Sequence, residues 1–143
     1  MKWDRGKMLI FGLAGAALAF AGSMISHLFA PLAKPGMDPD LIKMVSDMNR
    51  VLPIMVDKET RLDNAAVDSN ETLIYRFTLV NFNASDFPKN LIEEQLRPRF
   101  VEAYKTDPHD KVFRDKGVTL HAVFSDKNGA YITEMIVIPH DLR

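Results

Sequence analysis

The sequence predicts a small α+β domain that follows one apolar, membrane-spanning helix. Three observations support this fold class: an uncharged apolar run near the N-terminus, helical spacing of apolar residues after Asp38, and alternation of apolar and polar residues beyond Pro53. The expected element order is helix-strand-strand-helix-strand-strand, with an antiparallel sheet. The predicted divisions are a cytoplasmic N-terminal region (1–7), a transmembrane anchor (8–33), a linker and helix cap (34–40) and a periplasmic α+β domain (41–143).

The predicted anchor is the first element along the chain. Residues 8–30 contain no Asp, Glu, Lys or Arg. A helix of that length spans about 35 Å, enough to cross a hydrocarbon core about 30 Å thick. Lys2, Arg5 and Lys7 precede the run, so the positive-inside rule predicts a single pass through a bacterial inner membrane with a cytoplasmic N-terminus and a periplasmic C-terminal domain. The alternative is a signal peptide cleaved after Ala21, which places the domain in the same compartment.

Small residues recur at helical spacing within this run. In lipid, small side chains let two helix backbones approach closely, so this face is a candidate interface with another membrane protein subunit or with a second copy of the chain. The alternative is an ordinary transmembrane helix in which these residues contact membrane lipid. The candidate interface residues are Gly12, Gly15, Ala19, Gly22 and Ser23.

The first helix of the domain is expected directly after the linker. Asp38 is a favourable N-cap and Pro39 suits the first helical position. Apolar residues then follow at spacings of three and four, which predicts one buried stripe and one solvated face. The stripe comprises Leu41, Met44, Val45, Met48 and Leu52.

Two strands are expected next, then a second helix and a closing hairpin. The strands cover Thr60 to Val67 and Leu73 to Val80, joined by a turn at 68–71. The second helix is expected from Phe87 to Lys105, and Pro98 inside it predicts a kink or two short helices. The hairpin runs from Val118 to Ile138 through Asp126-Lys127-Asn128-Gly129, where Asn-Gly is a turn signal.

Composition excludes several kinds of chemistry. The chain has no cysteine, which excludes a disulfide scaffold, a cysteine zinc site and a thiol nucleophile. The chain has 18 Lys and Arg against 19 Asp and Glu, which gives a net charge of −1. It therefore lacks the excess of positive charge that is typical of nucleic-acid-binding proteins. The histidines lack metal-ligand spacing, and there is no phosphate-binding glycine loop. We therefore expect no cofactor, no metal and no catalytic residue.

One charged cluster remains as a candidate functional or structural site: Asp57, Glu59, Arg61 and Asp63. Its carboxylates could act as an acid and base pair. The alternative is a set of solvated charges with one ion pair at the start of a strand, in which Arg61 fixes the strand register.

Several segments resemble a loose set of small exported bacterial proteins of uncharacterised function. They are PIMVDKETRLDN (53–64), TLIYRFTLVN (72–81), LRPRF (96–100), GVTL (117–120), DKNG (126–129) and IPHD (138–141). A block of the form PxMVDxETRLD and a C-terminal strand hairpin carry this resemblance. Many members of the set have a pair of cysteines where this chain has Lys105 and Leu142. The resemblance implies export and fold but no activity.

These observations favour a non-catalytic accessory or interaction module of an envelope complex, anchored in the inner membrane. A periplasm-facing immunity or phage-exclusion factor is the alternative, and a small envelope enzyme is the third hypothesis.

Overall fold

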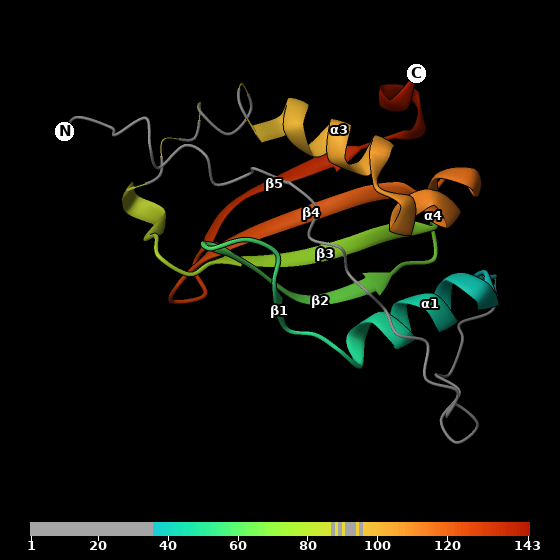
Figure 1. Cartoon of the computed structure of the whole chain (residues 1–143), viewed down its shortest axis with the longest axis horizontal. Helices are drawn as coiled ribbons and strands as arrows, with labels where there is room; N and C mark the ends of the chain where they lie inside the picture. Colours follow the sequence, from blue (N-terminus) through green and yellow to red (C-terminus); the bar gives the residue numbers. More distant parts are fainter. Residues whose placement is uncertain (1–35, 87, 89, 91–93, 95) are drawn as a thin grey trace.

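The computed structural model describes residues 36–86, 88, 90, 94 and 96–143 (Figure 1). In chain order the elements are α1 (Pro39–Asn49), β1 (Ile54–Met55), β2 (Thr60–Val67), β3 (Thr72–Leu79), η2 (Ala84–Asp86), α3 (Arg97–Thr106), η4 (Pro108–Asp110), α4 (Lys111–Asp115), β4 (Thr119–Asp126), β5 (Tyr131–Val137) and η5 (Pro139–Leu142). The strands form one five-stranded sheet in the order β1-β2-β3-β4-β5.

The sheet is mixed, which corrects the predicted antiparallel sheet. β3 and β4 are parallel neighbours, whereas every other pair of adjacent strands is antiparallel. The connection between β3 and β4 carries the helices α3 and α4. Such a crossover returns the chain to the end of the sheet at which β3 began, so the two strands run in the same direction.

The predicted order helix-strand-strand-helix-strand-strand is also wrong. β1 is a two-residue strand, too short to show the alternation that reveals a strand in a sequence. The described helix α3 begins at Arg97 with Pro98 in its first turn. A proline is tolerated there because the N–H groups of a first turn have no partner within the helix. A further helix, α4, follows after the short turn η4. Residues 90, 94 and 96 are also helical, and the rest of the segment before α3 lies outside the described residues, so the predicted kink at Pro98 stays a prediction.

The predicted transmembrane helix is not part of the described structure. The anchor over 8–33 lies outside the described residues, and so do Gly12, Gly15, Ala19, Gly22 and Ser23. Within the described ranges, no helix combines the length and the apolar character needed to span a membrane.

Other predicted elements are confirmed. Asp38 caps α1 by accepting the N–H of Asp40 at 2.8 Å, and the helix buries Leu41, Val45 and Met48. The strands β2 and β3 pair through the predicted turn, and β4 and β5 form the predicted hairpin. Gly129 in that hairpin has φ +84°, a backbone conformation that residues with a Cβ rarely adopt.

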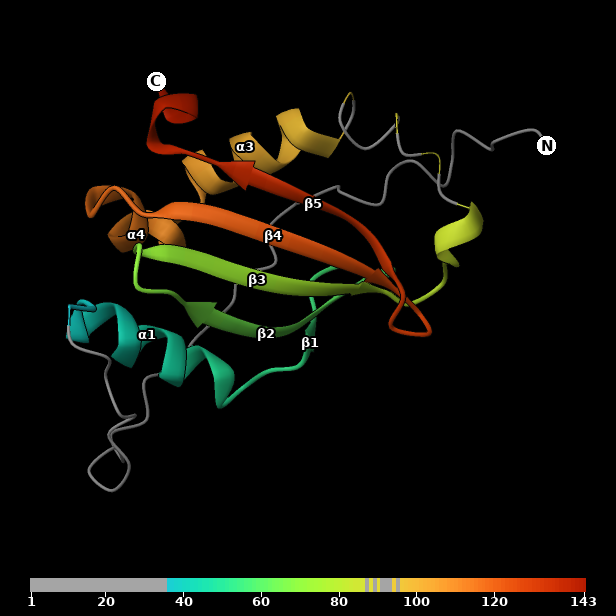
Figure 2. The same cartoon turned by 180° about the vertical axis from the view of Figure 1, so that it is seen from behind.

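The helices α3 and α4 lie against one face of the sheet (Figure 1), and Figure 2 shows β3, β4 and β5 with no helix in front of them. Alternate strand residues point into the core on the covered face, in agreement with the pleat. α3 docks there through Phe100, whose ring meets those of Phe77 and Phe124 edge to face at 6.2 Å, while these two rings stack at 5.0 Å.

α1 lies along the β2 edge of the sheet and closes part of it. The Asn49 side chain donates from Nδ2 to the carbonyl oxygen of Ala65 at 2.7 Å and accepts the N–H of Ala65 at 2.8 Å. The side-chain amide thus makes the two hydrogen bonds that the backbone of a neighbouring strand would make with Ala65. It therefore satisfies backbone groups that would otherwise be open at a sheet edge.

Candidate functional site

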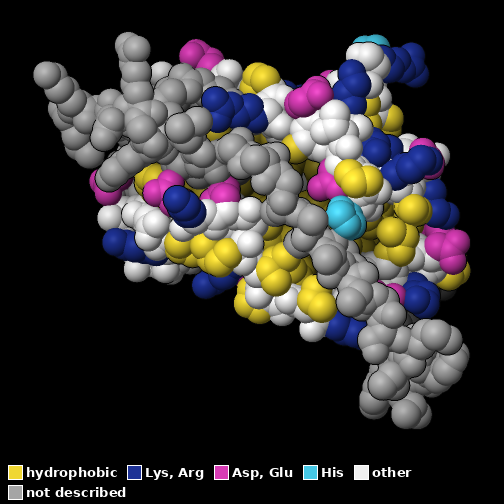
Figure 3. All heavy atoms as spheres, viewed as in Figure 1, with side chains coloured by type: hydrophobic (Ala, Val, Ile, Leu, Met, Phe, Trp, Pro, Cys, Tyr) yellow, Lys and Arg dark blue, Asp and Glu magenta, His cyan; other side chains and the backbone are white. Residues whose placement is uncertain are grey.

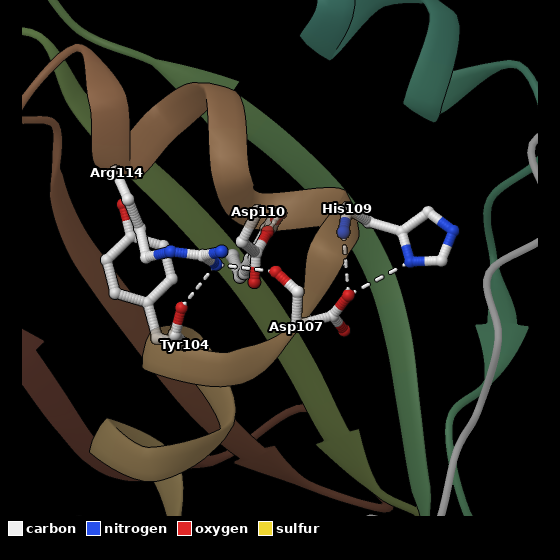
Figure 4. A network of polar contacts seen from close by, with 6 residues as sticks. Tyr104, Asp107, His109, Asp110 and Arg114 are labelled. Atoms are coloured by element: carbon white, nitrogen blue, oxygen red, sulfur yellow. Dashed lines mark hydrogen bonds and ion pairs between the residues drawn. The ribbon is translucent and has the colours of Figure 1, made fainter.

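The connection between α3 and α4 contains a compact group of polar side chains (Figure 4). We call the segment from Tyr104 to Arg114 the junction. Asp107 starts η4: its Oδ1 accepts the backbone N–H of His109 at 2.8 Å and lies 2.9 Å from the Nδ1 of the same residue. Asp followed by Pro is a favoured start of a short helix, so the sequence explains this local turn.

Arg114 ties the junction together from α4. Its Nη1 donates to the carbonyl oxygens of Tyr104 at 2.7 Å and of Asp107 at 2.5 Å. These carbonyls belong to the C-terminal end of α3, where a cation is favourable. The Tyr104 hydroxyl in turn donates to the carbonyl oxygen of Val118 at 3.1 Å, which links the junction to the start of β4.

Asp110 is the electrostatically unusual group of the junction. Its Oδ1 accepts a hydrogen bond from the hydroxyl of Tyr75, a core residue of β3, at 3.2 Å. Burial, and then the nearby charge of Asp107, raise the pKa of Asp110 to about 7, against the lowering effects of Tyr75, Arg114 and His109. Burial also raises the pKa of Tyr75 and of Tyr104. Near neutral pH, Asp110 therefore exists in both protonated and ionised forms.

Such a group in a polar cluster is a candidate for proton transfer. However, Asp107 and Arg114 use their polar atoms to hold backbone groups in place. In the described part of the chain, no three His, Asp or Glu side chains are arranged to hold a metal ion. The junction thus combines one titratable carboxyl with a structural network. Sequence analysis missed it, although the stretch Asp-Pro-His-Asp at 107–110 marks the turn.

The second candidate is the sheet face turned away from the helices, which we call the open face (Figure 2). The strand register places on it both polar and apolar side chains: Arg61, Asp63, Ile74, Arg76, Thr78, His121, Val123 and Glu134. Toward its two edges lie exposed apolar side chains, Met55 on β1 and Tyr131 and Ile136 on β5. Exposed apolar and aromatic side chains beside an arginine are typical of surfaces that bind another protein.

Part of the predicted charged cluster lies on the open face. Asp63 occupies a bulge in β2, where its Oδ1 accepts from Arg61 Nε and its Oδ2 accepts from the Thr78 hydroxyl, each at 2.5 Å. The structure therefore contains the single ion pair that was one of the two expectations. Arg76 stands next to it along β3 and is exposed.

The other members of the predicted cluster lie elsewhere. Asp57 shapes the turn before β2, since its Oδ1 accepts the N–H groups of Glu59 and Thr60 at 2.8 Å. The carbonyl oxygen of Glu59 accepts the N–H of Val80 at 2.9 Å, a backbone role that any residue could fill. Asp57 Oδ2 and the buried Thr60 hydroxyl have no hydrogen-bond partner in the described structure. The four residues therefore do not converge on one catalytic centre.

Surface charge agrees with the balanced composition. On the face seen in Figure 3, basic and acidic side chains lie intermixed and neither sign forms a continuous field.

Similar structures were found, although no family model matches the sequence and no curated protein matches it. A Pseudomonas aeruginosa protein described as secreted aligns with a TM-score of 0.61 at 13% identity, covering 73% of this chain and 90% of that one. The pilotin EpsS of the Vibrio vulnificus type 2 secretion system aligns with a TM-score of 0.56 at 14% identity, covering 71% and 86%. The type II secretion pilotin AspS of Vibrio cholerae gives 0.52 at 14% identity, covering 69% and 85%. The chain shares the fold of these proteins.

These likenesses correct the predicted location. A single-pass inner-membrane protein with a cytoplasmic N-terminus was expected, but the described structure contains no membrane-spanning helix. The proteins of similar fold are a protein described as secreted and two secretion-system pilotins. The run over 8–33 on which the expectation was based lies outside the described residues.

Proposed function

We propose that this chain is a non-catalytic accessory protein of a secretion system in the bacterial cell envelope, and that it acts by binding another protein of that system. The observation that supports the proposal most strongly is the fold shared with two type II secretion pilotins over about 70% of the chain. The polar networks agree with a binding role, since the junction and the Asp63 bulge hold backbone and neighbouring side chains in place.

The open face is the surface proposed to meet the partner. It presents exposed Tyr131 and Ile136 on β5, and the exposed Arg76 near its centre supplies a cation that a partner carboxylate can approach. Aromatic and arginine side chains contribute more than their share of binding energy at protein interfaces. A partner segment with apolar residues flanking an acidic one matches this surface.

Deletion of the gene in its own host tests the proposal. The amount of type II substrates in the culture medium should fall, and the unmodified gene should restore it. A gene carrying Arg76→Glu should fail to restore secretion although the protein accumulates normally, because the change reverses charge on an exposed side chain. Lys105→Glu, an equal reversal on the exposed end of α3, should restore it. Unchanged secretion in the deletion strain would contradict the proposed function.

A further inference from the structure

Two hairpin turns of this fold share one hydrogen-bond pattern, and the first joins β2 to β3. There, Asp68 Oδ1 accepts the N–H groups of Asn70 and Thr72, each at 2.9 Å. The Asp68 carbonyl oxygen accepts the N–H of Glu71 at 3.1 Å, and Glu71 has φ +56°. The exposed Asn70 therefore precedes a residue in the left-handed backbone region.

The turn between β4 and β5 repeats this pattern. Asp126 Oδ1 accepts the N–H groups of Asn128 at 2.8 Å and of Ala130 at 2.9 Å. The Asp126 carbonyl oxygen accepts the N–H of Gly129 at 3.0 Å, and Gly129 has φ +84°. Asn128 is exposed, as Asn70 is. The two turns thus present an asparagine in the same setting, followed by glutamate in one and by glycine in the other.

Glycine at position 129 leaves the backbone nitrogen after Asn128 unshielded. Asn128 is the only asparagine in the sequence that precedes a glycine. A Cβ placed on Gly129 would meet no atom within 4 Å, so the space beside this nitrogen is open. Asn128 Nδ2 lies 3.4 Å from Asn83 Oδ1, too far to hold the side-chain amide firmly. The amide carbon of Asn128 is therefore free to turn toward the Gly129 nitrogen.

One hydrogen bond opposes attack by this nitrogen, the bond from the Gly129 N–H to the Asp126 carbonyl oxygen. It lies at the tip of the hairpin, where residues 127–130 are all exposed. Exposed loop tips open locally at a low cost in free energy. The same bond is present at Glu71 in the other turn, so it does not distinguish the two asparagines.

We propose that Asn128 is a site of spontaneous deamidation. The Gly129 nitrogen, after losing its proton to hydroxide, attacks the side-chain carbonyl carbon of Asn128. A carbon–nitrogen bond forms, the bond from that carbon to Nδ2 breaks, and Nδ2 leaves as ammonia after taking up a proton from water. Water then opens the resulting cyclic imide. Opening at the side-chain carbonyl gives aspartate, and opening at the main-chain carbonyl gives isoaspartate.

The product changes the turn in two ways. The net charge of the chain falls by one, from −1 to −2, and the new carboxylate lies in the same turn as the buried carboxylate of Asp126. Isoaspartate also adds a carbon to the main chain between the two N–H groups that Asp126 Oδ1 holds. Tyr131 of the open face directly follows this turn. Deamidation therefore loosens the hairpin that positions Tyr131.

Peptide mapping of the full chain by mass spectrometry, after incubation in a mildly alkaline buffer, tests the proposal. Conversion of Asn128 to aspartate and isoaspartate should be faster than conversion of any other asparagine. It should quicken as the pH rises, because the nucleophile is the deprotonated amide. Transfer of a labelled methyl group by an isoaspartyl methyltransferase serves as the probe for isoaspartate. The isolated isoaspartate form should have a lower urea midpoint of unfolding.

The matched turn supplies the decisive variant. Glu71→Gly creates the same Asn-Gly pair between β2 and β3, where the positive φ suits glycine, and Asn70 should then deamidate as Asn128 does. Asn128→Ser should remove the methyl acceptance, whereas Asn70→Ser should retain it.

Three results would overturn the proposal. They are no conversion at Asn128, conversion at Asn70 equal to that at Asn128 in the unmodified chain, and an unreacted Asn70 in Glu71→Gly. None of these results depends on the secretion role.

Discussion

At the scale of single residues, side-chain groups that replace backbone partners determine where the sheet ends. Asn49 makes both hydrogen bonds of Ala65 on the β2 edge. On the opposite edge, Arg97 Nη1 donates to the carbonyl oxygen of Ile136 in β5 at 2.8 Å. The part of β2 that β1 does not cover and the edge strand β5 are thus partly blocked from pairing with other chains, a common protection of natural sheets.

Replacement of Asn49 by Ala should lower the free energy of unfolding by about 1–2 kcal/mol, because Ala65 loses both partners at a largely buried position. Urea denaturation measures this loss. Lys43→Ala, on the exposed face of the same helix, should change stability by less than about 0.5 kcal/mol. Similar losses in the two variants would show that Asn49 does not hold the edge.

The Asp63 bulge allows a comparison of two partners of one carboxylate. Asp63→Ala should cost about 1–2 kcal/mol of stability, because it leaves the nearly buried Thr78 hydroxyl without its acceptor. Arg61→Ala should cost less than about 1 kcal/mol, since its ion pair with Asp63 is partly exposed to solvent. Thermal unfolding of the two variants side by side checks the order, and a larger effect of Arg61→Ala would contradict it.

At the scale of elements, α3 packs against the sheet through two buried aromatic residues, Phe100 and Tyr104. Phe100→Ala should reduce the free energy of unfolding by about 3 kcal/mol, through lost burial and a cavity beside Phe77 and Phe124. Phe100→Leu keeps most of the volume and should cost about 1 kcal/mol. Urea denaturation of both variants tests this, and equal losses would show that the cost does not come from the volume removed at Phe100.

The β4–β5 hairpin is organised by Asp126, which is 4% exposed. Its side chain accepts the N–H groups of Ala84, Asn128 and Ala130, and the hydrogen bonds from Ala84 and Ala130 hold its pKa below the usual value. A lowered folded-state pKa stabilises the fold above about pH 4, and this stabilisation is lost as the pH falls through the lowered value. The urea midpoint of Asp126→Asn should therefore respond less to acid than that of the unmodified protein. An unchanged acid response would contradict this assignment.

At the scale of the whole molecule, the sequence allowed the local elements to be predicted but not their pairing. Alternation in β2 to β5 and the cap at Asp38 are local signals, and they placed α1, the strands and the hairpin correctly. The parallel pairing of β3 with β4 depends on the path of a helical crossover, which no local pattern encodes.

The candidate sites were less predictable for a similar reason. Arg61 and Asp63 lie close together in the sequence, and an ion pair within their cluster was one of the two expectations. The contact between Tyr75 and Asp110 joins positions 35 residues apart, and the raised pKa of Asp110 arises from burial that only the folded chain creates. The open face likewise emerges only when the register of β1 to β5 is known.

Site-specific photo-crosslinking in the native host tests the proposed role of the open face most directly. A photoreactive phenylalanine derivative at Tyr131, an exposed position on β5, should form an adduct with an identified subunit of the type II secretion system. The same derivative at Lys105, on the exposed end of α3, should form none. The absence of an adduct at Tyr131, an adduct only with a second copy of this chain, or equal adducts at both positions would contradict a secretion accessory that binds its partner through the open face.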